Sequence, residues 1–171
     1  MEKKNQVLVD VISQVVADIL GNNDQQGDAV SEKENELFHL PLAKRLAQVA
    51  EEKARQTNTP ISVAVVDASG NLVLFHRMPK AVTASVDYAQ HKAYTAAIYN
   101  WPSHKMDELI SPPSAMVALT NIDPKVTSLG GGMPIKVNGQ FIGGLGISGG
   151  PIAQDIEVAT AVLEAVFGKQ V

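Results

Sequence analysis

The chain has 171 residues, a formal net charge of −4, 45% hydrophobic residues and no cysteine. This length and composition are typical of one main globular domain with some additional chain. A sequence without cysteine excludes disulfides, iron–sulfur clusters, thiolate-bound haem and cysteine-based zinc sites. No basic patch accompanies the acidic balance, so we expect no nucleic-acid partner.

Residues 1–20 are predicted to carry an amphipathic docking helix. At helical spacing, its apolar stripe consists of Val7, Leu8, Val11, Ile12, Val15, Val16, Ile19 and Leu20. Polar residues interrupt the segment and no cleavage motif follows, which excludes a secretory signal and a membrane span and predicts a cytoplasmic protein without a membrane partner. Two interpretations stay open: the helix folds back onto the main domain or a sister subunit, or it docks onto a partner protein.

The main domain is predicted to span residues 36–171, after a flexible polar linker at residues 21–35. Its first element is a helix over residues 40–56. A β-hairpin follows over residues 61–78, with its turn at residues 67–71.

The second half of the domain repeats this alternation. An alanine-rich helix is predicted over residues 82–100, and its small-residue face is expected to lie close to a sheet. A short helix over 105–110 precedes a second hairpin over 134–148, whose turn is Asn-Gly, and a closing helix covers 152–167. Two hairpins among helices predict an α+β domain with one antiparallel sheet.

The stretch GLGISG at residues 144–149 matches the dinucleotide-binding pattern G-x-G-x-x-G. That motif needs a βαβ unit and an acidic residue about 20 residues further on. Here the strand before the glycines pairs in a hairpin and a single helix follows, so we exclude dinucleotide binding. Glycine within a strand instead marks a bulge, or the close approach of another backbone or a ligand.

Two glycine-rich segments at neighbouring strand ends are candidates for a ligand pocket lined by backbone. They are Gly130, Gly131 and Gly132, and Ser148, Gly149 and Gly150. The second segment precedes a helix, where free N–H groups favour an anionic group. The alternative is that these residues form tight turns and close packing without a ligand.

Four stretches occur in the order found in the GlcG/HbpS-like family: PISVAVVDASGNLVLFHRM, ASVDYAQHKAYTAA, GGGMPI and GGLGISGGPIAQD. Over residues 37–168 the sequence therefore resembles this family of haem-binding proteins, glycolate-locus proteins and PduO C-terminal domains. The resemblance implies a profilin-like antiparallel sheet flanked by helices and a homo-oligomer, often an octamer. It also implies binding of haem, or of a related corrinoid or porphyrin, in some members.

The resemblance also bears on the first 35 residues. The cobalamin adenosyltransferase domain of PduO-type proteins has no counterpart in this sequence, so we do not expect that activity. The predicted helix and linker instead resemble the encapsulation peptides that direct cargo into bacterial microcompartments. This implies a microcompartment shell or cargo protein as the partner of residues 5–20, and the microcompartment interior as a location.

Without cysteine, haem iron would be bound by His, Met or Tyr, or keep an open position. His39 is the first candidate, because the resemblance implies a ligand histidine just before the first domain helix; a surface or capping role is the alternative. His91 and His104 are further candidate ligands, while His76 is expected to be structural.

Lys92 belongs to the K-A-x-T-A pattern of the family and lies near the small-residue face of its helix. Two kinds of partner stay open for it: a buried acid such as Asp67, or the carboxylate of a ligand. Asp155 is expected to stabilise the first turn of the closing helix, and Asp67 is expected to be a turn residue.

No hydrolase or transferase motif is present: G-x-S-x-G, H-E-x-x-H and the P-loop are all missing from the sequence. We therefore assign no catalytic residue. The leading hypothesis is a non-catalytic module that binds haem or another tetrapyrrole and docks through its N-terminal helix. The alternatives are an accessory enzyme for a small hydroxyacid or aldehyde, with Lys92 or a histidine as acid or base, and a ligand-free assembly protein.

Overall fold

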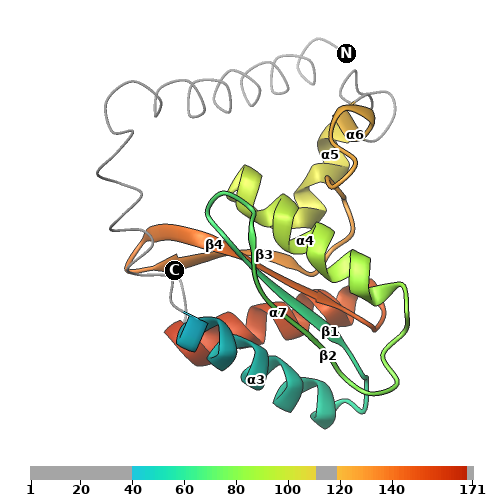
Figure 1. Cartoon of the computed structure of the whole chain (residues 1–171), viewed down its shortest axis with the longest axis vertical. Helices are drawn as coiled ribbons and strands as arrows, with labels where there is room; N and C mark the ends of the chain where they lie inside the picture. The colour runs from blue at the N-terminus through green and yellow to red at the C-terminus, as the bar shows by residue number, and fades with distance from the viewer. Residues whose placement is uncertain (1–39, 111–118, 169–171) are drawn as a thin grey trace. The chain divides into compact units, whose positions relative to one another are not determined.

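A four-stranded antiparallel sheet built from two hairpins forms the centre of the fold (Figure 1). The strands are β1 (Ser62–Asp67), β2 (Leu72–Arg77), β3 (Gly132–Val137) and β4 (Gln140–Ser148). Their order in the sheet is β2-β1-β4-β3, so the hairpins join through the antiparallel pairing of β1 with β4. The structure is a computed structural model that describes residues 40–110 and 119–168.

Both hairpin turns have a local chemical cause. The Asp67 carboxylate accepts hydrogen bonds from the backbone N–H groups of Ser69 and Asn71, each at 2.9 Å, and so fixes the first turn. This confirms Asp67 as a turn residue. In the second turn Asn138 and Gly139 have φ angles of 53° and 81°, as a two-residue hairpin turn requires.

Helices cover both faces of the sheet (Figure 1). They are α3 (Leu40–Gln56) and α7 (Ile152–Phe167) on one face, and α4 (Ser85–Tyr99) on the other. Side chains of β1 alternate between the two faces of the sheet. Val63 and Val65 belong to the core under α3 and α7, while Ala64 and Val66 pack with α4.

The α4 helix lies very close to the sheet because both surfaces have small residues. A Cβ atom added to Gly144 would collide with the carbonyl oxygen of Ala93, and one added to Gly146 would collide with that of Ala89. Both alanines are fully buried. The strand glycines therefore allow close approach of the helix backbone, which confirms the contact predicted for the small-residue face.

The predicted α+β class and the order of elements are confirmed. The bounds of α3 and α7 agree with prediction. The α4 helix begins at Ser85 rather than Val82. Val82 instead starts a turn, in which its carbonyl oxygen accepts a hydrogen bond from the backbone N–H of Ser85 at 2.9 Å. The predicted short helix is a 3₁₀ turn, η1 (Ser103–Met106), followed by α5 (Asp107–Ile110).

A further short helix, α6 (Leu119–Ile122), was not expected from the sequence. The predictions for residues 1–20 and 21–35, and for His39, lie outside the described residues. Among the helices of residues 40–110 and 119–168, none has the length and apolar character needed to cross a membrane.

Candidate functional site

A buried ion pair connects the two helical layers at one end of the central strands. The Lys92 ammonium of α4 lies 2.7 Å from Asp155 Oδ2 in the first turn of α7. It also donates to the Ile147 carbonyl at 2.9 Å and to the Ser148 hydroxyl at 3.3 Å. Both charged residues are only 2% exposed. The three acceptors match the three donors of an ammonium group.

Gly131 makes room for this ion pair. A Cβ atom there would lie 2.7 Å from the carbonyl oxygen of Ile147, 2.9 Å from Asp155 Cβ and 3.3 Å from Lys92 Nζ. The φ angle of Gly131 is +113°, which a residue with a side chain rarely adopts. The second oxygen of the acid is also occupied, since Asp155 Oδ1 accepts the backbone N–H of Gly150 at 3.0 Å.

Within the described chain the partner of Lys92 is a buried acid, and its role toward a ligand stays a prediction. Its partner acid is Asp155, and Asp67 instead holds its own turn. The expected role of Asp155 was therefore incomplete: it lies in the first helical turn, but it is a buried counter-ion. Burial lowers the pKa of the Lys92 amino group, while the hydrogen bond and charge of Asp155 oppose that shift.

The two glycine-rich segments have packing partners in the structure. An added Cβ on Gly130 would meet the Ile156 side chain at 2.5 Å, and one on Gly132 would collide with the backbone carbonyl of Lys92. At Gly149 it would collide with the carbonyl of Pro60. Close packing therefore accounts for these glycines, and their role toward a ligand stays a prediction.

The described histidines lie apart from this ion pair. His76 Nδ1 is 3.0 Å from Glu51 Oε1 on α3, in keeping with a structural role. His104 is exposed in η1. His91 is half-buried on α4, next to Lys92 in sequence but on the wall of a surface pocket.

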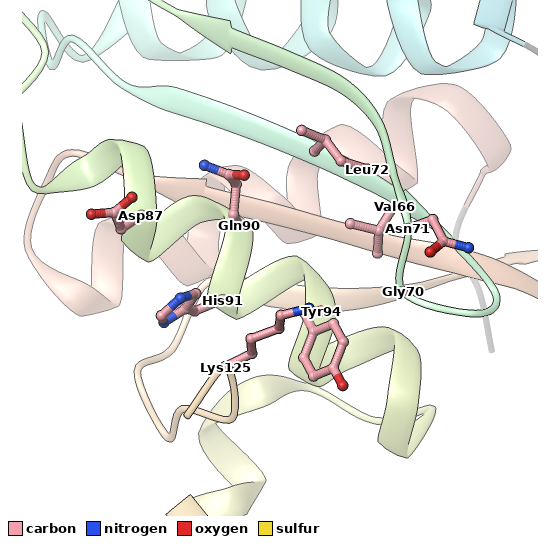
Figure 2. A pocket seen from close by; sticks show the side chains of 9 residues that line it. All are labelled: Val66, Gly70, Asn71, Leu72, Asp87, Gln90, His91, Tyr94 and Lys125. Carbon is pink, nitrogen blue, oxygen red and sulfur yellow. The ribbon is translucent and has the colours of Figure 1, made fainter. Parts of the chain in front are cut away.

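This pocket, of about 300 Å³, lies between α4 and the β1–β2 hairpin (Figure 2). Four of its lining residues occupy one face of α4 at helical spacing: Asp87, Gln90, His91 and Tyr94. The hairpin contributes Val66, Gly70, Asn71 and Leu72, and Lys125 lies beside Tyr94. Sequence reasoning selected only His91 of this set. The spacing 87, 90, 91 and 94 was visible, but a polar helix face usually contacts water only.

One carboxylate organises the Lys125 side of the pocket. Asp123 Oδ2 accepts the Tyr94 hydroxyl at 2.8 Å, and Asp123 Oδ1 accepts the backbone N–H of Lys125 at 3.0 Å. The hydrogen bond to Asp123, with some burial, raises the pKa of Tyr94 to about 12. The Lys125 ammonium lies 5.1 Å from the centroid of the Tyr94 ring, a cation–π contact.

In the described part of the chain, no group of three or more His, Cys, Asp or Glu side chains is arranged to hold a metal ion. A haem iron needs fewer protein ligands than such a site. One or two side-chain donors are enough, because the macrocycle supplies the others.

Comparison with known proteins identifies the family. The family model described as "Haem degrading protein HbpS-like" matches residues 38–164. The chain belongs to the HbpS-like family. This confirms the resemblance inferred from the four motifs, and the matched region contains both the ion pair and the pocket.

Two curated relatives and one solved structure of this HbpS-like chain are informative. An uncharacterized 15.0 kDa protein from the dhaT–dhaS intergenic region of Citrobacter freundii is 37% identical over 127 residues, 73% of this chain and 89% of that protein. The corrinoid adenosyltransferase PduO of Salmonella typhimurium is 36% identical over 123 residues. That match covers 71% of this chain but only 37% of PduO. The crystal structure of the PduOC:heme complex superposes with a TM-score of 0.71 at 34% identity, covering 75% of this chain and 94% of that one.

Proposed function

We propose that this protein binds haem, or a closely related tetrapyrrole, without transforming it. The observation that carries the proposal is the likeness to the PduOC:heme complex, which extends over 94% of that chain. The match to PduO as a whole covers about a third of that enzyme, so the adenosyltransferase activity is not part of the proposal.

The donors available on the described surface are compatible with haem iron. The ring nitrogens of His91 and His104 have no hydrogen-bond or ion-pair partner among the described residues, so both can offer an imidazole to an iron. His76 is engaged by Glu51. His39 remains the first candidate from the family resemblance. Lys92 is a poor candidate for a haem carboxylate, because Asp155 already neutralises it.

A haem titration followed by absorbance tests the proposal, with parallel titrations of His39→Ala, His91→Ala and His104→Ala. We expect a saturable Soret shift in the wild type and its loss in His39→Ala. His76→Ala is the matched control and should behave like the wild type. A wild-type titration without saturation would overturn the haem proposal. Loss in His91→Ala or His104→Ala alone would overturn only the assignment to His39.

The name of the family model raises haem degradation as the competing function. Degradation would consume the Soret band in the presence of a reductant and oxygen, whereas a binding module would preserve it. Lys92 and Asp155 are buried and engaged with each other, so this pair is not available as an acid and base toward haem. The fate of the Soret band under reducing conditions decides between the two functions.

We further propose that residues 5–20 dock the protein onto a microcompartment shell or cargo protein. The support is the apolar stripe in the sequence and its resemblance to encapsulation peptides. A fluorescent protein fused to residues 1–35 should co-localise with microcompartments in cells that form them. Val11→Asp in the stripe should abolish this, while Ser13→Asp on the polar face should not. Diffuse fluorescence of the unmodified fusion would contradict the proposal.

A homo-oligomer is the third part of the proposal, with an octamer as the form that the family resemblance implies. Several large apolar side chains are exposed on the described surface, including Ile122 at 80%, Val82 at 59% and Ile152 at 50%. Self-association would cover such residues. Light scattering coupled to size-exclusion chromatography gives the subunit number directly, and a monomer at micromolar concentration would refute this part.

A further inference from the structure

Hydrogen bonds and one close contact hold the backbone and the Tyr94 ring in the walls of the surface pocket beside α4. Asp67 binds the backbone of the β1–β2 turn, and Asp123 binds both the Tyr94 hydroxyl and the backbone of Lys125. Gly70 fits against Tyr94 so closely that an added Cβ would lie 2.8 Å from the ring. Such walls do not need to be ordered when a ligand binds, which lowers the cost of binding.

The two ends of the pocket have opposite character. Lys125 and Tyr94 lie together at one end, and Asp87 lies toward the other, with His91 between them on the helix (Figure 2). Asp87 and Tyr94 are seven residues apart, which corresponds to a rise of about 10 Å along the helix. The pocket is therefore polarised along α4.

Two charged groups of the pocket form no ion pair within the described part of the protein. The exposed Lys125 ammonium contacts the Tyr94 ring, and the Asp123 oxygens accept from the Tyr94 hydroxyl and the backbone N–H of Lys125 rather than from that ammonium. Asp87 and the His91 ring have no hydrogen-bond or ion-pair partner among the described residues. A cation without an acid partner favours a carboxylate, while Asp87 favours a hydrogen-bond donor.

We propose that this pocket binds a short organic carboxylate that has a hydroxyl or ammonium group at its other end. The carboxylate lies at Lys125, and the donor group lies at Asp87. Val66 and Leu72 of the hairpin cover the carbon chain between them. The volume of about 300 Å³ is at the small end of ligand sites and suits a compact metabolite rather than a macrocycle. The proposal does not depend on where haem binds.

Two-dimensional ¹H–¹⁵N NMR of the full chain tests the proposal with 4-hydroxybutyrate and 4-aminobutyrate as probes. Butyrate and 1,4-butanediol are the matched controls, since the first lacks the donor group and the second lacks the carboxylate. We expect saturable shifts at the amides of Gly70, His91 and Lys125 with at least one probe, and weaker binding of both controls.

A pair of lysine variants makes the test specific to the pocket. Lys125→Gln keeps the backbone N–H that Asp123 binds and removes the charge, so it should weaken the binding of the probe by about tenfold. Lys105→Gln removes an exposed lysine of η1 outside the pocket and should have no effect. The proposal is overturned if neither probe gives saturable shifts at these amides, if 1,4-butanediol binds equally well, or if the two variants bind alike. An unchanged haem titration of Lys125→Gln would show that the two sites are independent.

Discussion

Two neighbouring residues of α4 have opposite surroundings. Lys92 is 2% exposed and has three protein acceptors for its ammonium group. His91 lines an open pocket and has no hydrogen-bond partner among the described residues. The buried lysine thus maintains the fold, and its half-buried neighbour is available to a ligand.

This contrast separates stability from binding in the protein. The ion pair of Lys92 and Asp155 connects α4, β4 and α7, so it holds the helical layers in register with the sheet. Apart from the buried Val66, the pocket residues are half-buried or exposed. Asp67 and Asp123 fix their loops by hydrogen bonds to the backbone. Changes at the first site should destabilise the protein strongly, and changes at the second should have little effect on its stability.

The largest effect is expected from Lys92→Met. The variant leaves the buried Asp155 carboxylate without its counter-ion, so the free energy of unfolding should fall by about 3–5 kcal/mol. Urea unfolding followed by circular dichroism measures the change. The double variant with Asp155→Leu should recover part of the loss, because no unpaired charge remains. A loss below about 1 kcal/mol in Lys92→Met would show that the ion pair is not a main support of the fold.

Gly146→Ala is expected to be the next most harmful change. The new methyl group would collide with the Ala89 carbonyl and lie 2.6 Å from the backbone nitrogen of Ala93, so α4 must move away from the sheet. Overpacking of this kind costs about 1–3 kcal/mol. Gly139→Asn is the control, since a Cβ there meets nothing within 4 Å and asparagine tolerates the positive φ. Equal stability of the two variants would contradict the tight contact.

The pocket wall can be examined through the ionisation of Tyr94. Because Asp123 and burial raise the pKa of Tyr94 to about 12, only about one-tenth of the Tyr94 hydroxyl groups should be ionised at pH 11. In Asp123→Asn the pKa should fall toward the usual value near 10, and most of the ring should then be ionised at pH 11. Absorbance near 295 nm reports this difference, after the signal of the Tyr94→Phe variant is subtracted to remove the other tyrosines. Identical titrations would show that Asp123 does not hold the tyrosine.

The same shift gives a pH dependence of stability. Below pH 10 the tyrosine is protonated in both the folded and unfolded chains, so its contribution is complete there. Above pH 10 the unfolded chain loses the proton first, and this stabilisation is lost as the pH rises toward 12. The decline should be shallower in Asp123→Asn.

The smallest effect is expected from His91→Ala. The side chain is half-buried at the pocket edge, so the free energy of unfolding should change by no more than about 0.5 kcal/mol. Thermal unfolding of His91→Ala and Lys92→Met, measured side by side, gives the change in stability of each variant. A loss of similar size in both would contradict the claim that Lys92 supports the fold and His91 does not.

Most of the architecture could be predicted from the sequence, because helices and hairpins are indicated by patterns of neighbouring residues. Apolar spacing placed α3 and α7, and the Asn138–Gly139 dipeptide placed the second hairpin. The glycines of β4 predicted a close backbone approach, and the structure supplies the α4 backbone. The resemblance of the four motifs to the family predicted the same fold class independently.

The contacts of the candidate site depend on tertiary structure, which local patterns do not encode. Lys92 and Asp155 are 63 residues apart in sequence, and nothing near either residue indicates which acid the lysine meets. Asp67 was the natural choice because it follows a buried strand, but its own turn uses its oxygens. The pocket was missed for the same reason, since Gly70 and Lys125 lie beside α4 only in the tertiary structure.

The most direct test of the central claim is the lifetime of the haem complex. Haem is added to the purified full chain at equal concentration, and the Soret band is followed for an hour in air after ascorbate is supplied. We expect a protein-dependent Soret band that persists after reduction, as the proposed binding without turnover requires. No protein-dependent band, or a band that decays to the absorbance of a bile pigment, would contradict this account.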